Sequence, residues 1–290
     1  LRRRQRQMCI RDRKRIVSIQ DISCFGKCSL TVALPIISAM GIEACPVPTA
    51  VLSTHTGGFT GYTYRDLTND IPSIADHWKS LDLKFDAVAT GYLGSFEQIK
   101  IVSDFFDKFK TDDNLIIVDP VMGDKGHFYA GFTEDFALEM KKLCSKADVI
   151  VPNLTEAAQL LDEDYIDSGY DEEYIKNLLI RLSNLGSKIV VLTGVSFDDN
   201  SQGVMSYNRE TGEFSSYFNE NIPGYFHSTG DIFSSTLCGA LVKGFDMGKA
   251  VKIAVDFTVD CIKHTIGSEK EHWYAVKFEE CIPDLIEMIK

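Results

Sequence analysis

Short apolar segments alternate along the chain with longer segments of helical periodicity. The short segments are rich in β-branched residues and are predicted to be strands. They are Ile16–Ile19, Asp86–Thr90, Leu115–Val118, Asp148–Val151 and Lys188–Leu192. Strands that alternate with helices form a mostly parallel sheet joined by right-handed crossovers. The sequence therefore predicts a three-layer α/β fold, with helices on both faces of a mostly parallel central sheet.

Further helices and strands complete this prediction. Helices are expected at Cys28–Met40, Ile71–Ser80, Phe96–Lys110, Thr133–Lys146, Tyr174–Leu185, Ile232–Gly244, Lys249–Thr265 and Phe278–Ile289, with one more starting near Asn153. A strand over Glu43–Leu52 contains Pro46 and Pro48, which place it near an edge of the sheet. Gln202–Asn208 and Glu213–Phe218 are predicted to form a β-hairpin.

Polar residues follow five of the predicted strands. They are Gln20-Asp21, at the start of a predicted loop over 20–27, then Tyr92, Asp119, Asn153 and Thr193. Ligands of open parallel sheets bind beyond the carboxyl ends of the strands. We therefore expect these side chains to meet at one edge of the sheet and to line a ligand site.

The stretch His227–Ser235 is expected to join this site. Small residues there lead directly into an apolar helix, so Thr229 and Gly230 lie where backbone amides lack partners within the helix. Such a helix start attracts anions, and Asp231 is placed to take a proton from an attacking hydroxyl group. This pattern predicts phosphoryl transfer. The alternative is that Ser228-x-x-Asp231 is only a helix capping box.

Charge narrows the class of protein. The formal net charge is −12, and residues 1–14 are strongly basic, so the remainder is more acidic still. An acidic surface argues against nucleic acid as a partner, and it makes Mg²⁺ a natural companion of any bound polyphosphate. We expect residues 1–14 to be a non-native or disordered basic leader, and residues 15–290 to form a single domain.

Cysteine usage and hydropathy bear on the compartment. Eight cysteines are scattered at irregular spacings, and no apolar run approaches the roughly 20 residues of a membrane span. We expect reduced thiols, a cytoplasmic location and no membrane partner. Cys24-x3-Cys28 lacks a second close pair, so ordinary packing is expected there rather than a metal site.

Several motifs occur in an order and spacing that resemble a known family. Asp119-Pro-Val-Met-Gly-Asp124, Pro152-Asn153-x-x-Glu156 and the Thr229-Gly230-Asp231 turn resemble the ribokinase superfamily. The motifs that narrow the resemblance to its pyridoxal (pyridoxamine) kinases are Ile19-Gln20, His55-Thr56-Gly57 and Gly91-Tyr92-Leu93-Gly94. The resemblance implies a ribokinase-like fold, ATP-dependent phosphorylation of a vitamin B6 compound, and a homodimer.

The resemblance also implies a role for each part of the site. Asp231 would deprotonate the 5′-hydroxymethyl group of the vitamin, while the amides around Thr229 and Gly230 hold the transferring phosphoryl group. Glu156 and Asp119 would lie near Mg²⁺ on the ATP phosphates, since this ion takes a few protein oxygens plus water and phosphate. ATP is the implied co-substrate, and a monovalent cation is a further candidate cofactor.

ATP-binding side chains are implied at Asp119, Asn153, Thr193, Tyr129 and Lys125. Some of these positions have simpler interpretations. Taken alone, Asn153 and Glu156 fit an ordinary helix start, and a lone loop lysine is usually only solvated.

Substrate-binding side chains are implied at Asp21, Thr56, Tyr92 and His227. Thr56 and Tyr92 would contact the pyridine ring and its substituents. The family usually has Ser where this chain has Asp21, and an anion there favours a protonated pyridinium, so we predict that Asp21 pairs with the ring nitrogen. The first glycine of the family's turn is Ser228 here, which narrows the freedom of the backbone but leaves its amides in place.

Two other functions stay open. A hydroxymethylpyrimidine kinase of thiamine synthesis resembles this fold and chemistry, and the ring pocket formed by Asp21, Thr56 and Tyr92 decides between the two. A non-catalytic vitamin-binding protein on the same scaffold is the other, against which the presence of Asp231 and Glu156 argues. A dinucleotide oxidoreductase is disfavoured, because no Gly-x-Gly-x-x-Gly follows the first strand.

Overall fold

The computed structural model describes residues 13–268 and 270–290. The predicted basic leader, residues 1–14, therefore lies almost wholly outside the described residues. None of the helices in the described part of the chain combines the length and apolar character needed to cross a membrane.

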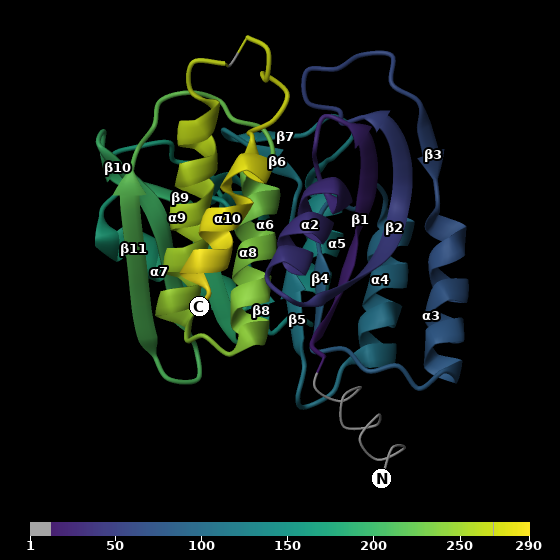
Figure 1. Ribbon diagram of the computed structural model, residues 1–290. Coiled ribbons are helices and arrows are strands. Elements are labelled where there is room, and N and C mark those ends of the chain that lie inside the picture. Colours follow the sequence, from purple (N-terminus) through teal and green to yellow (C-terminus); the bar gives the residue numbers. More distant parts are fainter. Residues whose placement is uncertain (1–12, 269) are drawn as a thin grey trace.

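Strands and helices alternate through most of the chain (Figure 1). The strands are β1 (Arg15–Phe25), β2 (Glu43–Thr54), β3 (Tyr64–Asp66), β4 (Ala87–Thr90), β5 (Leu115–Val118), β6 (Gly123–Asp124), β7 (His127–Phe128), β8 (Val149–Ile150), β9 (Ile189–Asp198), β10 (Ser201–Asn208) and β11 (Glu213–Glu220). The helices are α2 (Leu30–Ala39), η1 (Thr68–Asp70, a 3-10 turn), α3 (Ile71–Ser80), α4 (Phe96–Phe109), α5 (Glu134–Cys144), α6 (Leu154–Leu161), α7 (Glu172–Ser183), α8 (Thr229–Lys243), α9 (Met247–Thr265) and α10 (Phe278–Met288). Each element predicted from the sequence is present, although several bounds differ.

One large sheet forms the centre of the described chain. It has nine strands in the order β11-β10-β9-β8-β5-β4-β1-β2-β3. The strands from β9 to β2 in this order are parallel, whereas the pairings at the edges, β2 with β3, β9 with β10 and β10 with β11, are antiparallel. The central strand β5 is wholly apolar, as expected for a strand that is covered on both faces. The predicted mostly parallel α/β sheet is confirmed.

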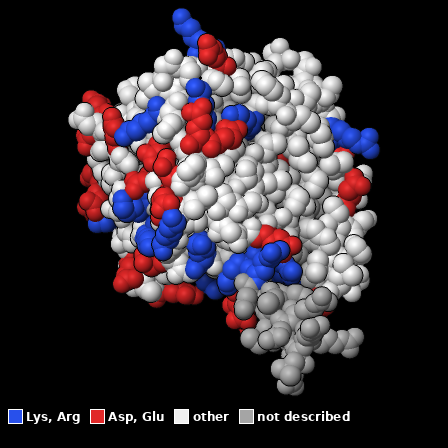
Figure 2. Space-filling view, viewed as in Figure 1, with Lys and Arg blue, Asp and Glu red and all other residues white. Residues whose placement is uncertain are grey.

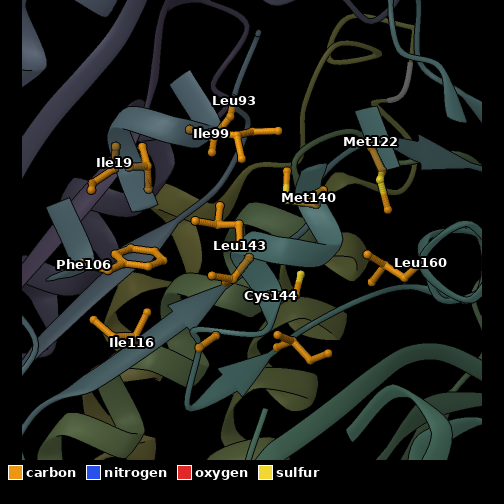
Figure 3. Close-up of a cluster of buried hydrophobic side chains, with 14 of the residues drawn as sticks. Ile19, Leu93, Ile99, Phe106, Ile116, Met122, Met140, Leu143, Cys144 and Leu160 are labelled. Atoms are coloured by element: carbon orange, nitrogen blue, oxygen red, sulfur yellow. The ribbon is translucent and has the colours of Figure 1, made fainter. Parts of the chain in front are cut away.

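Helices cover both faces of this sheet. On the face toward the viewer in Figure 1, α2, α8, α9 and α10 share an apolar cluster with strand residues such as Ile16 and Ile117. On the other face, α3 to α7 enclose the cluster drawn in Figure 3, which includes Ile19 and Ile116. Successive strand residues point to opposite faces, so the central strands contribute to both cores. The three-layer arrangement is confirmed.

Two details of the sequence prediction are wrong. Residues 20–25 are not a loop, because β1 continues through them beside β2 with an irregularity in pairing. Thr193 does not follow a strand but lies inside β9, which continues to Asp198. The predicted place of β2 near an edge is confirmed, because only the short strand β3, paired with residues 50–52, lies outside it.

Candidate active site

The turn that begins α8 packs against the loop between β1 and α2. Ser228 adopts a left-handed conformation (φ 73°), and its hydroxyl donates a hydrogen bond to the Lys27 carbonyl. Ser228 makes no side-chain hydrogen bond to the helix, so the capping-box alternative is wrong. The Asp231 carboxylate instead accepts the backbone amide of Ser29 at 3.0 Å. A Cβ built on Gly230 would meet no atom within 4 Å, so the helix start is open at this residue.

Asp231 and Asp119 line one small cavity between the sheet and α8. Its volume is about 20 Å³, enough for roughly one water molecule. Ser234, almost one turn after Asp231, donates a hydrogen bond to Asp119 at 2.5 Å. Burial raises the pKa of Asp231 to about 7; the Ser29 amide opposes this rise and the charge of Asp21 adds to it. Burial, together with the charge of Asp231, also raises the pKa of Asp119. With a pKa of about 7, Asp231 is partly protonated at neutral pH.

Asn153 and Glu156 form a capping box at the start of α6. The Asn153 side chain accepts the Glu156 amide, and the Glu156 side chain accepts the Asn153 amide, both at 2.9 Å. The simpler interpretation, a helix start, is therefore confirmed. Glu156 also accepts the Met122 amide at 3.2 Å and is only 3% exposed. These bonds fix its carboxylate in the interior.

The Glu156 carboxylate lies within electrostatic range of Asp119. Burial, and then the charge of Asp119, raises the pKa of Glu156 well above its usual value. Two buried carboxylates that repel each other fit a cation between them. No group of three or more His, Cys, Asp or Glu side chains in residues 13–268 and 270–290 could hold a metal ion. A cation bound here would therefore need further oxygen ligands from water or phosphate.

Thr193, Tyr129 and Lys125 surround this part of the site. Thr193 pairs with Asn153 in an isolated β-bridge, which places it beside the start of α6. Burial, followed by the charge of Glu156, raises the pKa of Tyr129. The Lys125 ammonium lies 4.7 Å from the ring centre of Tyr225. The structure thus brings Thr193 and Tyr129 to the predicted nucleotide side, while Lys125 is engaged by an aromatic ring.

Asp21 and Tyr92 lie together on the predicted vitamin side. Asp21 is 5% exposed and accepts a hydrogen bond from Ser23 at 3.1 Å. Burial raises the pKa of Asp21, although hydrogen bonds from the side chains of Ser29 and Ser23 oppose the rise. Burial also raises the pKa of Tyr92 to about 12, with smaller contributions from Tyr64 and from the charge of Asp21. A buried carboxylate beside aromatic rings is thus present where the pyridine ring was predicted.

Thr56 and His227 come from segments that touch each other. Thr56 is exposed in the loop after β2, between His55 and Gly57. The rings of His55 and His227 are 5.1 Å apart, and a Cβ on Gly57 would lie 2.7 Å from the His227 ring. Burial, and then the proximity of His55, lowers the pKa of His227, so this imidazole is neutral at pH 7. The loop after β2 therefore packs against the turn that begins α8.

Sequence analysis missed three residues that shape this site. The Ser29 amide donates to Asp231, the Ser29 side chain opposes the rise of the Asp21 pKa, and the Ser234 hydroxyl donates to Asp119. His55 lies in the His55-Thr56-Gly57 motif, and the sequence alone indicates no role for its side chain. Only Ser234 gave a signal in the sequence, since it lies three residues after Asp231 on a helix, where side chains share a face.

At the turn that begins α8, the backbone amides can bind a phosphate group and the Asp231 carboxyl group lies beside them. This arrangement suits a phosphotransferase of the ribokinase superfamily. Comparison with known proteins agrees. The family model described as phosphomethylpyrimidine kinase matches residues 33–275. The chain belongs to this family, and it is a kinase with the ribokinase-like fold.

Solved structures and curated relatives narrow the comparison. The chain is 40% identical to a candidate phosphomethylpyrimidine kinase from Bacteroides thetaiotaomicron, over 94% of each chain, with a TM-score of 0.91. A second crystal form of that protein was solved with pyridoxal. Pyridoxal kinase from Lactobacillus plantarum is 28% identical over 95% of this chain and 97% of its own, with a TM-score of 0.86.

The curated relatives differ in how much of their length is matched. Pyridoxal kinase from Dictyostelium discoideum is 27% identical over 88% of each protein. The thiamine biosynthetic bifunctional enzyme TH1 of Arabidopsis thaliana is 28% identical, and the match covers 84% of this chain and 47% of that enzyme. The chain thus spans about half the length of the bifunctional enzyme and most of the pyridoxal kinase.

Proposed function

We propose that this protein transfers the terminal phosphoryl group of ATP to the 5′-hydroxymethyl group of pyridoxal, pyridoxamine or pyridoxine, giving the 5′-phosphate used in vitamin B6 salvage. One observation carries the proposal. Asp231, a carboxyl group with a pKa of about 7, lies in the first turn of α8 beside the open backbone at Gly230. The relatives named as pyridoxal kinases support the choice of substrate.

Asp231 acts as the general base. Its ionised carboxylate accepts the proton of the hydroxymethyl group as the oxygen attacks the phosphorus, and a base of this kind contributes about 10²–10⁴ in rate. The Ser29 amide fixes one carboxylate oxygen at 3.0 Å and leaves the other for the substrate. The amides of Thr229 and Gly230 stabilise the charge on the transferring phosphoryl group.

The nucleotide binds on the side of α6, against Asn153, Thr193, Tyr129 and Lys125. Asp119 and Glu156 would hold Mg²⁺ there. The raised pKa values of these two buried carboxyl groups support this assignment, because a cation bound beside them would stabilise their ionised forms. When bound, this ion neutralises charge on the phosphates. A monovalent cation fits the same acidic surroundings.

The vitamin ring binds between Asp21 and the loop that carries Thr56. Asp21 pairs with the protonated ring nitrogen, because a cationic ligand stabilises a buried carboxylate. Tyr92 contacts the ring, and neutral His227 lies at the boundary with the phosphoryl site.

The family model favours a second candidate, phosphorylation of hydroxymethylpyrimidine or its phosphate. One substrate panel separates the two. ADP release is measured with each B6 compound and with hydroxymethylpyrimidine, using the wild-type protein, Asp21→Asn, and Asp104→Asn as a matched exposed carboxylate on α4. We expect higher kcat/KM for the B6 compounds, lowered at least tenfold by Asp21→Asn alone. Preference for hydroxymethylpyrimidine would replace the proposal by the second candidate.

A homodimer and a cytoplasmic location complete the proposal. Figure 2 shows an area without charged side chains on the face where α2 and β2 lie in Figure 1. Helix α2 has no charged residue, and β2 has only Glu43. We expect the wild type to elute as a dimer in light-scattering chromatography, and Leu34→Glu, on the outer side of α2, to shift it toward monomer. The cysteines among the described residues are free, which supports a reducing compartment.

A further inference from the structure

Aromatic side chains from three distant segments meet beside the turn that begins α8. Phe25 ends β1, Phe59 lies in the loop 55–61, and Trp273 and Tyr274 lie in residues 270–277, between α9 and α10. The rings of Phe59 and Trp273 are 4.7 Å apart, and those of Phe25 and Tyr274 are 4.8 Å apart. We name these four residues the aromatic wall. None of them takes part in the proposed phosphoryl transfer.

His55 holds two of these segments together. Its Nδ1 accepts the amide of Gly57 at 3.0 Å, which leaves Nε2 as the protonated nitrogen that donates to the Tyr274 carbonyl at 2.9 Å. The ring is therefore bonded on both sides to backbone, once within its own loop and once to residues 270–277. Burial lowers the pKa of His55, which favours the neutral form that this geometry requires.

The loop 55–61 is built for close approach. Gly58 has a φ of 82°, and a Cβ there would lie 2.7 Å from the Trp273 ring. Gly57 is similarly close to His227. A side chain at either position would push the loop away from one neighbour, so glycine permits contact with both the aromatic wall and the α8 turn.

The aromatic wall still exposes much apolar surface. Phe25 is 52% exposed and Trp273 is 43% exposed, although both contact other rings. In Figure 1, residues 270–277 and the loop 55–61 rise above the same end of the sheet, which is the end where the strands deliver Asp21 and Asp119. Exposed rings at this place can pack against a planar aromatic ligand.

We propose that residues 270–277 form one side of the subsite for the aromatic ring of the substrate, and that His55 is the positioning residue that holds them against the loop 55–61. The proposal rests on the proposed function and adds a specificity-determining segment to it. Trp273 and Phe59 retain the ring by contact, whereas His55 acts through the Tyr274 and Gly57 backbones and does not touch the reacting atoms.

Trp273 supplies its own probe, because the chain has only two tryptophans. The other, Trp78, packs on Phe85 in the core of the opposite face, and Trp78→Phe isolates the Trp273 signal. We expect pyridoxine, added without nucleotide, to change the Trp273 emission with saturation. ATP added alone is expected to leave that emission unchanged. Loss of the pyridoxine response in an otherwise folded protein would overturn the inference.

Kinetics separate this role from a merely structural one. Trp273→Ala is expected to raise KM for pyridoxine about five- to tenfold, while KM for ATP changes less than twofold. Trp273→Phe should recover most of the loss. His55→Leu should behave like Trp273→Ala, and His55→Gln, which keeps a donor for the Tyr274 carbonyl, should recover part of it. Leu138→Ala, 53% exposed on α5, is the matched control and should match the wild type.

The two proposals fail in different ways. Unchanged KM for pyridoxine in both Trp273→Ala and His55→Leu would refute the aromatic wall as a subsite and leave the proposed function standing. No turnover of any B6 compound by the wild type would refute the proposed function. In that case a Trp273 response to hydroxymethylpyrimidine would still support the wall, and its absence would refute the wall as well.

Discussion

The rate of phosphorylation should follow the ionisation of Asp231. Burial raises the pKa of this carboxyl from 3.8 to about 7, so the free protein prefers the protonated form by roughly 4 kcal/mol relative to an ordinary aspartate. Only the ionised form can accept the hydroxyl proton. About one tenth of the molecules are ionised at pH 6, about half at pH 7 and about nine tenths at pH 8.

The perturbation is Asp21→Asn, which removes a negative charge that helps raise the pKa of Asp231. Removing that charge lowers the pKa, so the acidic limb of the profile should move to lower pH. The assay is kcat/KM for pyridoxine from pH 5.5 to about 8.5 at saturating MgATP, because this parameter reports the ionisation of the protein before the vitamin binds. Weaker binding of the vitamin, which the same variant is also expected to cause, lowers the whole profile, whereas a changed pKa of Asp231 moves its acidic limb along the pH axis.

Asp104→Asn is the control for this experiment, because that carboxylate is exposed on α4. Its profile should overlay that of the wild type. A wild-type profile that is flat between pH 6 and 8, or an acidic limb that stays in place in Asp21→Asn, would refute the assignment of the limb to Asp231.

Three further results are expected. Gly230→Ala should keep or raise the thermal midpoint, because Ala favours a helix by about 0.8–1.0 kcal/mol over Gly and no atom lies within 4 Å of the added Cβ. The same variant should lower kcat at least tenfold by crowding the phosphoryl site, and an unchanged kcat would contradict an anion site there. Ser228→Ala should lower the free energy of unfolding in urea by about 1 kcal/mol, because the hydrogen bond to the Lys27 carbonyl is lost while the strain of the left-handed backbone stays. Ser228→Gly loses the same bond but relieves the strain, so it should be nearly neutral, and equal losses in the two variants would contradict this balance. The raised pKa of Asp231 contributes stability that is fully present below pH 3.8 and is lost as the pH rises through about 7. The urea midpoint without ligands should therefore fall less steeply from pH 6 to about 8 in Asp231→Asn than in the wild type, and parallel slopes would contradict the raised pKa.

The layers of the fold follow directly from the sequence, because short β-branched runs and helical periodicity differ in period. The fully apolar Leu115–Val118 becomes the central strand β5. What the pattern did not reveal are elements that tertiary contacts create. The strand β3 and the hairpin β6–β7 have three residues or fewer per strand, too few to show a period, and β1 extends to Phe25 because β2 pairs with it.

The candidate site divides in the same way. Asp119, Asn153 and Asp231 could be predicted because each follows a strand or opens a helix, and the structure places Asp119 and Asp231 on one cavity. Ser29 could not be predicted, since it holds Asp231 through a backbone amide that any residue possesses. The His55 contact with Tyr274 joins positions far apart in sequence and depends on the path of residues 270–277.

The central claim is that the Asp231 carboxylate removes the hydroxyl proton during phosphoryl transfer. Single-turnover measurement of Asp231→Asn, with binding of ATP and pyridoxine determined separately, tests it most directly. The chemical step should slow about 10²–10⁴-fold, while both dissociation constants stay within about threefold of the wild type. A chemical step within tenfold of the wild-type rate, in a variant that binds both ligands normally, would contradict it.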